Sequence, residues 1–162
     1  MNNLFYKLLL IIALCPSWSL ASENHETIHL FLQEAKVFTA GEGMEEVLKY
    51  RCGDLDLDGE EECAILWQWT RAGSWDVYLN IVNRHGGTLS SQGFGRSAML
   101  LGTVPYSGGV LILVEYGEQQ SGDVSCCPSR LKVATYRWYK GELQQLGDGE
   151  LPETSRANKT GL

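Results

Sequence analysis

The stretch GDLDLDGEEEC at residues 53–63 concentrates oxygen ligands of the kind that hold a hard divalent cation. Counted from Asp54 as position 1, carboxylates occupy the odd positions. Gly59 stands at position 6, where such a loop needs a left-handed turn that glycine adopts at low cost. In this frame position 7 contributes only its backbone carbonyl, and position 9 closes the coordination shell. The expected calcium ligands are therefore Asp54, Asp56, Asp58 and Glu62, with the carbonyl of Glu60.

The spacing excludes an EF-hand, because Ile65 occupies the position at which an EF-hand places a bidentate glutamate. A solvated acidic turn, built from Asp and Gly for turn chemistry alone, is the alternative interpretation. Six carboxylates within nine positions repel one another, however, and a divalent ion relieves that repulsion whereas a bare turn does not. We therefore expect weak calcium binding, with a Kd of about 10⁻⁴ to 10⁻³ M, that braces the loop.

Cysteines flank this loop and recur once more along the chain. Cys52 and Cys63 stand at the two ends of the loop, where a disulfide would pin its base. Cys126 and Cys127 are adjacent, so a bridge between them would be strained. The predicted pairing is Cys52–Cys63 with Cys126–Cys127. Bridges that cross between the two regions, and a rigid turn held with Pro128, are the alternatives.

A second set of candidate ligands spells H-E-x-x-H, in which two imidazoles one helical turn apart bind zinc and the glutamate activates water. The residues are His25, Glu26 and His29, and His85 is the remaining histidine that could supply a third ligand. This motif supports an alternative function, a small periplasmic zinc hydrolase. It lies close to the expected start of the mature chain, where helices fray, so an exposed helix start is the favoured interpretation.

The elements that must position these residues are one helix followed by strands. Residues 26–38 partly follow the apolar spacing of an amphipathic helix, which the sequence TAGEG ends. Gly-rich stretches at 86–95 and 107–109 are expected loops. The expected strand segments are 44–51, 63–70, 75–83, 110–116 as a central strand buried on both faces, and a final hairpin of 131–139 with 143–146. The predicted fold class is α+β, with one N-terminal helix packed on a largely antiparallel β-sheet.

The two ends of the chain are expected to lie outside this domain. Residues 1–21 combine Lys7, an apolar run and a small-x-small ending, which is typical of a cleaved secretory signal. We expect a single domain over residues 22–148 and a flexible tail over 149–162, with no further apolar run of spanning length. Removing Lys7 with the signal changes the net charge from −7 to −8, which disfavours nucleic acid as a partner. The expected location is periplasmic or secreted.

Two motifs in a fixed order carry a resemblance to a known family. GDLDLDGEEECAIL, YLNIV, GDVSCCPSR and YRWYKGEL follow one another within residues 46–146. In this order they resemble the secreted bacterial LppP/LprE lipoproteins and their periplasmic relatives. The acidic loop alone is similar to the calcium loops of integrin-type FG-GAP repeats. Leu57 departs from the family pattern, in which a glycine is usual at that position, and no lipidation sequence is present.

The resemblance implies export and a fold, and it brings no established activity. Large aromatic residues on the expected strands are interpreted first as core packing and second as a binding face. They are Trp67, Trp69, Trp75, Tyr78, Trp138 and Tyr139. The sequence therefore favours an exported non-enzymatic module, braced by calcium and two disulfides, that binds an unidentified protein or envelope component.

Overall fold

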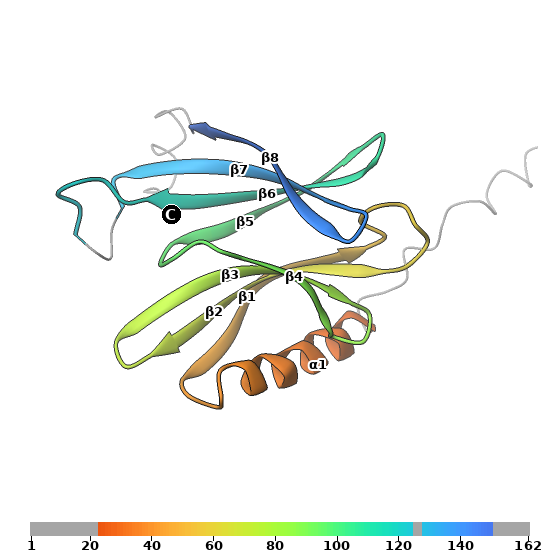
Figure 1. Cartoon of the computed structure of the whole chain (residues 1–162), viewed down its shortest axis with the longest axis horizontal. Helices are drawn as coiled ribbons and strands as arrows, with labels where there is room; N and C mark the ends of the chain where they lie inside the picture. The colour runs from red at the N-terminus through yellow and green to blue at the C-terminus, as the bar shows by residue number, and fades with distance from the viewer. Residues whose placement is uncertain (1–22, 125–127, 151–162) are drawn as a thin grey trace, which may run out of the picture.

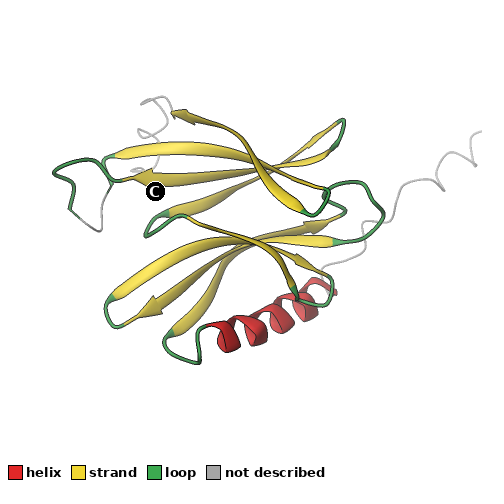
Figure 2. Cartoon of the chain, viewed as in Figure 1, coloured by secondary structure: helices red, strands yellow, loops and turns green. Residues whose placement is uncertain are grey.

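The computed structural model describes residues 23–124 and 128–150, and within them one helix precedes eight strands (Figure 2). The helix is α1 (Glu23–Phe38). The strands are β1 (Met44–Gly53), β2 (Glu62–Arg71), β3 (Ser74–Asn83), β4 (Thr88–Gly93), β5 (Ala98–Tyr106), β6 (Gly109–Glu118), β7 (Arg130–Tyr139) and β8 (Glu142–Glu150). The expected signal segment, the adjacent cysteines at 126 and 127 and most of the expected tail lie outside the described residues.

The strands form two antiparallel sheets of four, each in simple sequence order. The first sheet runs β1-β2-β3-β4 and the second runs β5-β6-β7-β8. Figure 1 shows the two sheets stacked face to face, with α1 across the outer face of the first sheet. The first sheet is therefore a middle layer, covered on both faces.

Two apolar clusters correspond to these two interfaces. The cluster between the sheets includes Leu66, Leu79, Ile81, Ile112, Val114 and Trp138. The cluster between α1 and the first sheet consists of Phe31, Ala35, Cys63, Ile65, Trp67 and Val82. Strand β2 contributes to both clusters by alternation, which explains why its first six residues are all buried.

Helix α1 is fixed at both ends. Phe31 and Ala35, one turn apart, face the first sheet and are 1% and 4% exposed. After the last turn the N–H of Gly41 donates to the carbonyl of Lys36 at 2.9 Å. Gly41 itself has a φ of 70°, as expected for a glycine that ends a helix. Near the start, the Thr27 hydroxyl donates to the Arg84 carbonyl at 2.9 Å, which ties α1 to the turn after β3.

The structure confirms a helix with antiparallel strands and differs from the expected single sheet. Strand β6 is central, as predicted, but only Ile112 and Val114 are fully buried while Leu111 and Leu113 are partly exposed. The prediction that both faces of β6 are buried is wrong, because among the described elements only the first sheet covers the second. Residues 149 and 150, assigned to the tail from sequence, belong to β8.

Candidate metal centre

The acidic loop connects β1 to β2 and brings three aspartates together. One carboxylate oxygen from each of Asp54, Asp56 and Asp58 lies within 4.8 Å of the others. In the part of the chain that the structure describes, this is the only group of three or more His, Cys, Asp or Glu side chains with that spacing. The spacing matches three ligands of one hard cation, whose bonds to oxygen measure about 2.3–2.6 Å.

The backbone of the loop is organised by two of the same carboxylates. The oxygens of Asp54 accept from the N–H groups of Asp58 and Gly59, both at 3.0 Å, and Asp58 accepts from the Glu60 N–H at 2.8 Å. Gly59 has a φ of 93°, the left-handed turn expected at this position. Leu57 is also left-handed, with a φ of 63°, although its Cβ disfavours that conformation.

A buried leucine anchors the loop to the second sheet. Leu55 is 2% exposed and packs in the cluster between the sheets. Its carbonyl accepts from the Val110 N–H at 2.9 Å, at the start of β6. A Cβ at Gly109 would lie 2.4 Å from the same carbonyl, so only glycine allows this approach. The loop is thus held by the first sheet at its ends and by the second sheet at Leu55.

Two carboxyl groups around the loop lie where a negative charge is unfavourable. Asp56 Oδ1 is buried without a hydrogen-bond partner, and burial, followed by repulsion from Asp58, raises the pKa of Asp56. Glu62 is 4% exposed, and its Oε2 accepts from the Leu55 N–H at 3.1 Å. Burial is the main cause that raises the pKa of Glu62 to about 7, and the charges of Asp56, Asp58 and Asp54 raise it further. A bound cation would offset both penalties.

The residues present therefore fit a divalent cation, with one difference from the expected ligand set. Asp54, Asp56 and Asp58 converge as predicted. Glu62 does not join their group and instead accepts from Leu55. Glu60 is exposed and its N–H donates to Asp58, while its carbonyl as a ligand stays a prediction.

The disulfide predicted at the base of the loop is confirmed. Cys52 and Cys63 are paired across β1 and β2 with their Cα atoms 4.0 Å apart, and the bridge spans a sequence separation of 11. The second predicted bridge, Cys126–Cys127, falls outside the described residues.

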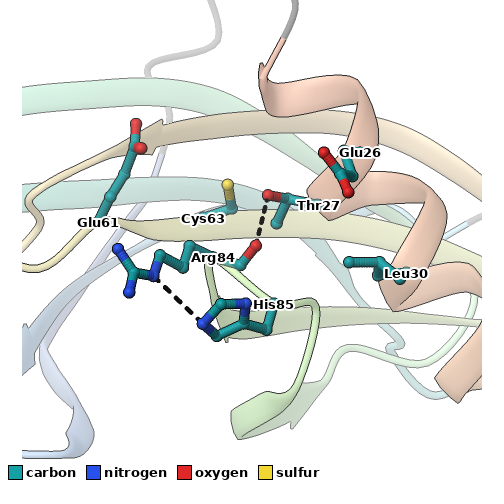
Figure 3. Close-up of a pocket in the computed structure, with 7 residues that line it drawn as sticks. All are labelled: Glu26, Thr27, Leu30, Glu61, Cys63, Arg84 and His85. Atoms are coloured by element: carbon teal, nitrogen blue, oxygen red, sulfur yellow. Dashed lines mark hydrogen bonds between the residues drawn. The ribbon is translucent and has the colours of Figure 1, made fainter.

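Two cavities lie beside the loop and share Glu61, Arg84 and His85. One, of about 360 Å³, separates the acidic residues from the turn after β3. The other, of about 430 Å³, lies between that turn and the start of α1 (Figure 3). There Arg84 Nε donates to His85 Nε2 at 3.2 Å, and in the described residues the Arg84 guanidinium makes no ion pair.

The structure places the H-E-x-x-H residues on the surface of α1. His25, Glu26 and His29 are all exposed, and the nearest partner of His29 is the Gln33 amide at 3.1 Å. Glu26 and His85 line the same cavity, but neither belongs to a group with metal-ligand spacing in the described residues. The arrangement is that of an exposed helix start.

Sequence reasoning missed the residues that hold the loop in place. Leu55 interrupts the run of acidic residues and Gly109 opens a strand 54 positions later, and nothing in their local pattern links them. The loop contains two leucines, of which Leu55 is buried and Leu57 is 62% exposed, so an apolar residue in the loop did not by itself identify the anchor. Its burial depends on a second sheet, which the sequence did not reveal.

Comparison with protein-family models, with curated proteins and with solved structures finds no match to this chain. No described helix has the length and apolar character needed to cross a membrane.

Proposed function

We propose that this chain is an exported, non-catalytic β-module whose acidic loop binds a divalent cation of the calcium type. The observation that carries the proposal is the convergence of the Asp54, Asp56 and Asp58 carboxylates, together with a buried Asp56 oxygen that has no hydrogen-bond partner. Three carboxylates held this close are stabilised by a cation and destabilised without one. Oxygen-only ligands favour calcium over metals that prefer nitrogen or sulfur.

The role of the cation in this proposal is to brace the two sheets. The loop ends are joined by the Cys52–Cys63 bridge, and its middle is bonded to β6 through Leu55. A cation that fixes the loop conformation therefore stabilises the contact between the sheets. Export, the resemblance to LppP/LprE proteins and an envelope or protein ligand belong to the same proposal. The secretory character of residues 1–21 and the cysteine pairing support them.

The zinc hydrolase that the H-E-x-x-H sequence allowed has no observation of its own in its favour. A zinc site needs three protein ligands held around an open position. His25 and His29 lie on an exposed helix surface without a third partner at ligand distance in the described residues. We therefore retain the cation-braced module alone.

The test is the melting temperature of the mature protein in chelator and in calcium. Binding to the folded state alone raises its stability by RT ln(1 + [Ca²⁺]/Kd), which is about 1.4 kcal/mol at ten times Kd. For a domain of this size that is a shift of roughly 2–6 °C. Asp56→Ala removes one of the three converging carboxylates and should abolish the shift.

Glu61→Ala is the matched control, because Glu61 is an exposed acidic neighbour outside the aspartate group. It should retain most of the calcium shift. For each protein the quantity compared is the melting temperature in calcium minus that in chelator. This is needed because Asp56→Ala also relieves repulsion between carboxylates and so changes the melting temperature in chelator. If the unmutated protein is indifferent to calcium, or if both variants lose the shift equally, the loop is an acidic turn and the proposal is wrong.

A further inference from the structure

A separate cavity lies between the second half of α1 and the first sheet, on the side of β4. Its volume is about 150 Å³, the size of an engineered cavity that accommodates one benzene molecule. Four aromatic residues from three elements line it: Phe31 and Phe38 from α1, Trp67 from β2 and Tyr78 from β3.

The inner rings form a fixed wall. Trp67 stacks on Tyr78 with ring centroids 5.2 Å apart, and Phe31 meets Trp67 edge to face at 5.6 Å. Trp67 is held by its indole N–H, which donates to Asn80 at 3.0 Å. Phe38 is different, because it lines the same cavity while 75% of it is exposed. A ligand in the cavity would cover part of this ring.

One carboxylate lines the mouth of the cavity. Glu34 is exposed and accepts from the Thr88 N–H at 3.2 Å, and in the described part of the chain it pairs with no cation. Aromatic faces and an uncompensated carboxylate both attract positive charge. The ligand that complements this cavity is therefore a small cation with an apolar surface.

The other polar groups of the cavity decide which kind of cation fits. Asn80, Thr88 and Ser91 are bonded to one another: the Asn80 oxygen accepts from Ser91 at 2.9 Å, and its amide donates to Thr88 at 3.3 Å. Besides the Glu34 carboxylate, the acceptors that line the cavity belong to this network, and they are too few to replace the water around the three N–H donors of a primary ammonium. A quaternary ammonium has no N–H group and loses less hydration than a primary ammonium on leaving water, and aromatic walls are a recurring way to bind it.

We propose that the cavity between α1 and β4 binds a quaternary ammonium group, of the size of trimethylammonium. Glu34 supplies the counter-charge, and Tyr78 and Phe38 supply the accessible aromatic surface. This site is independent of the acidic loop, which lies on a different part of the first sheet and shares no lining residue with it. The group could be a free solute such as choline or the headgroup of a phosphatidylcholine lipid.

The experiment is an NMR titration of the mature protein that follows the Trp67 indole N–H, with choline chloride as the probe. We expect saturable shifts with a Kd on the order of 1 mM. The neutral isostere 3,3-dimethylbutan-1-ol has the same shape without the charge, and ethanolamine has the charge without the methyl groups. Both should bind at least about tenfold more weakly, a factor that corresponds to 1.4 kcal/mol.

Variants locate the site. Glu34→Gln and Phe38→Ala should each weaken choline binding about tenfold. Glu46→Gln and Val37→Ala are the matched controls, since both residues are exposed and neither lines the cavity. These four side chains are on the surface, so the variants should fold. Sedimentation with phosphatidylcholine but not phosphatidylglycerol vesicles would assign the lipid headgroup, and choline binding without sedimentation would assign a free solute.

The proposal is overturned if the Trp67 signal is unchanged at choline concentrations far above 1 mM. It is also overturned if the neutral isostere binds as tightly as choline, or if Glu34→Gln binds choline as the unmutated protein does. A calcium response plays no part in these outcomes, so the ammonium site and the cation loop can fail separately.

Discussion

Replacing Glu62 by glutamine should change how the stability of the metal-free protein depends on pH. The folded structure raises the pKa of this buried carboxyl from 4.5 to about 7, through burial first and then through the three aspartates. The folded state therefore keeps a proton that the unfolded state releases in this range. The stability that this retained proton gives the folded state is fully present below pH 4.5 and is lost as the pH rises through 7.

The magnitude follows from the size of that shift. One unit of pKa difference corresponds to about 1.4 kcal/mol, so a rise from 4.5 to about 7 sets an upper limit of roughly 3 kcal/mol on the loss. Glutamine is neutral throughout, and its oxygen can accept from the Leu55 N–H as the carboxylate does. Glu62→Gln in chelator should thus be more stable than the unmutated protein at pH 8, by at most this amount, and similar to it at pH 4.5.

The assay is urea unfolding in chelator at several values between pH 4.5 and 8, with the disulfides left oxidised. Glu61→Gln is the control, because it removes the same charge from an exposed position and should keep the unmutated slope. Two results would refute the reasoning: a pH slope in Glu62→Gln as steep as that of the unmutated protein, or a stability of the unmutated protein that rises relative to Glu62→Gln over this window. A smaller slope remains expected from Asp56, whose pKa is also raised. Calcium plays no part in this measurement, so it tests the electrostatics of the loop separately from cation binding.

Two further substitutions test how the loop is held. Leu57→Gly should leave the free energy of unfolding unchanged or raise it by up to about 1 kcal/mol. A left-handed side chain costs about 1–2 kcal/mol, glycine loses more backbone entropy on folding, and Leu57 is 62% exposed, so little packing is lost. A clear decrease in the free energy of unfolding, measured in urea, would contradict the strain argument. Joint replacement of Cys52 and Cys63 by alanine should lower the free energy of unfolding by about 3 kcal/mol, from the chain entropy of a bridge with a separation of 11. A loss below about 1 kcal/mol would show that the bridge adds little to the paired strands.

The segments that sequence predicted well are those with strong local patterns. The helix expected from residue 26 is α1, and the strands expected around Trp67, Tyr78 and Ile112 are β2, β3 and β6. Their apolar residues are frequent enough to define the period. The acidic loop and the Cys52–Cys63 bridge were predicted because their residues lie within twelve consecutive positions, 52–63.

The prediction that 86–95 is a loop is wrong, because β4 lies within it, and β5 was not predicted at all. Both were missed because pairing, rather than propensity, makes them strands. The sequence of β4 is TLSSQG, in which most residues are exposed, and β5 contains Gly102 and Pro105. Both are edge strands that obtain their hydrogen bonds from β3 and β6. With β4 and β5 unassigned, the predicted strands before and after them were interpreted as one sheet, and the second layer could not be inferred.

The four edge strands share a feature that disfavours pairing with the edge of another sheet. The pairings β2–β3 and β6–β7, in the centre of each sheet, run without a shift, whereas each edge strand skips one residue. The skipped residues are all leucines, Leu48, Leu89, Leu101 and Leu146, between 38% and 50% exposed.

A skipped residue bends and twists its strand and interrupts the regular row of N–H and C=O groups that another edge would need for pairing. Leucine is not itself protective, because an exposed apolar residue on a flat edge favours association. The bulges therefore carry the protection, and they carry it in all four edge strands. Met44, Met99 and Val104 are also exposed on edge strands, at positions where the ladder is regular. Each bulge lies within a few residues of such a position or carries an exposed leucine itself, so it disrupts the edge where apolar residues would favour association.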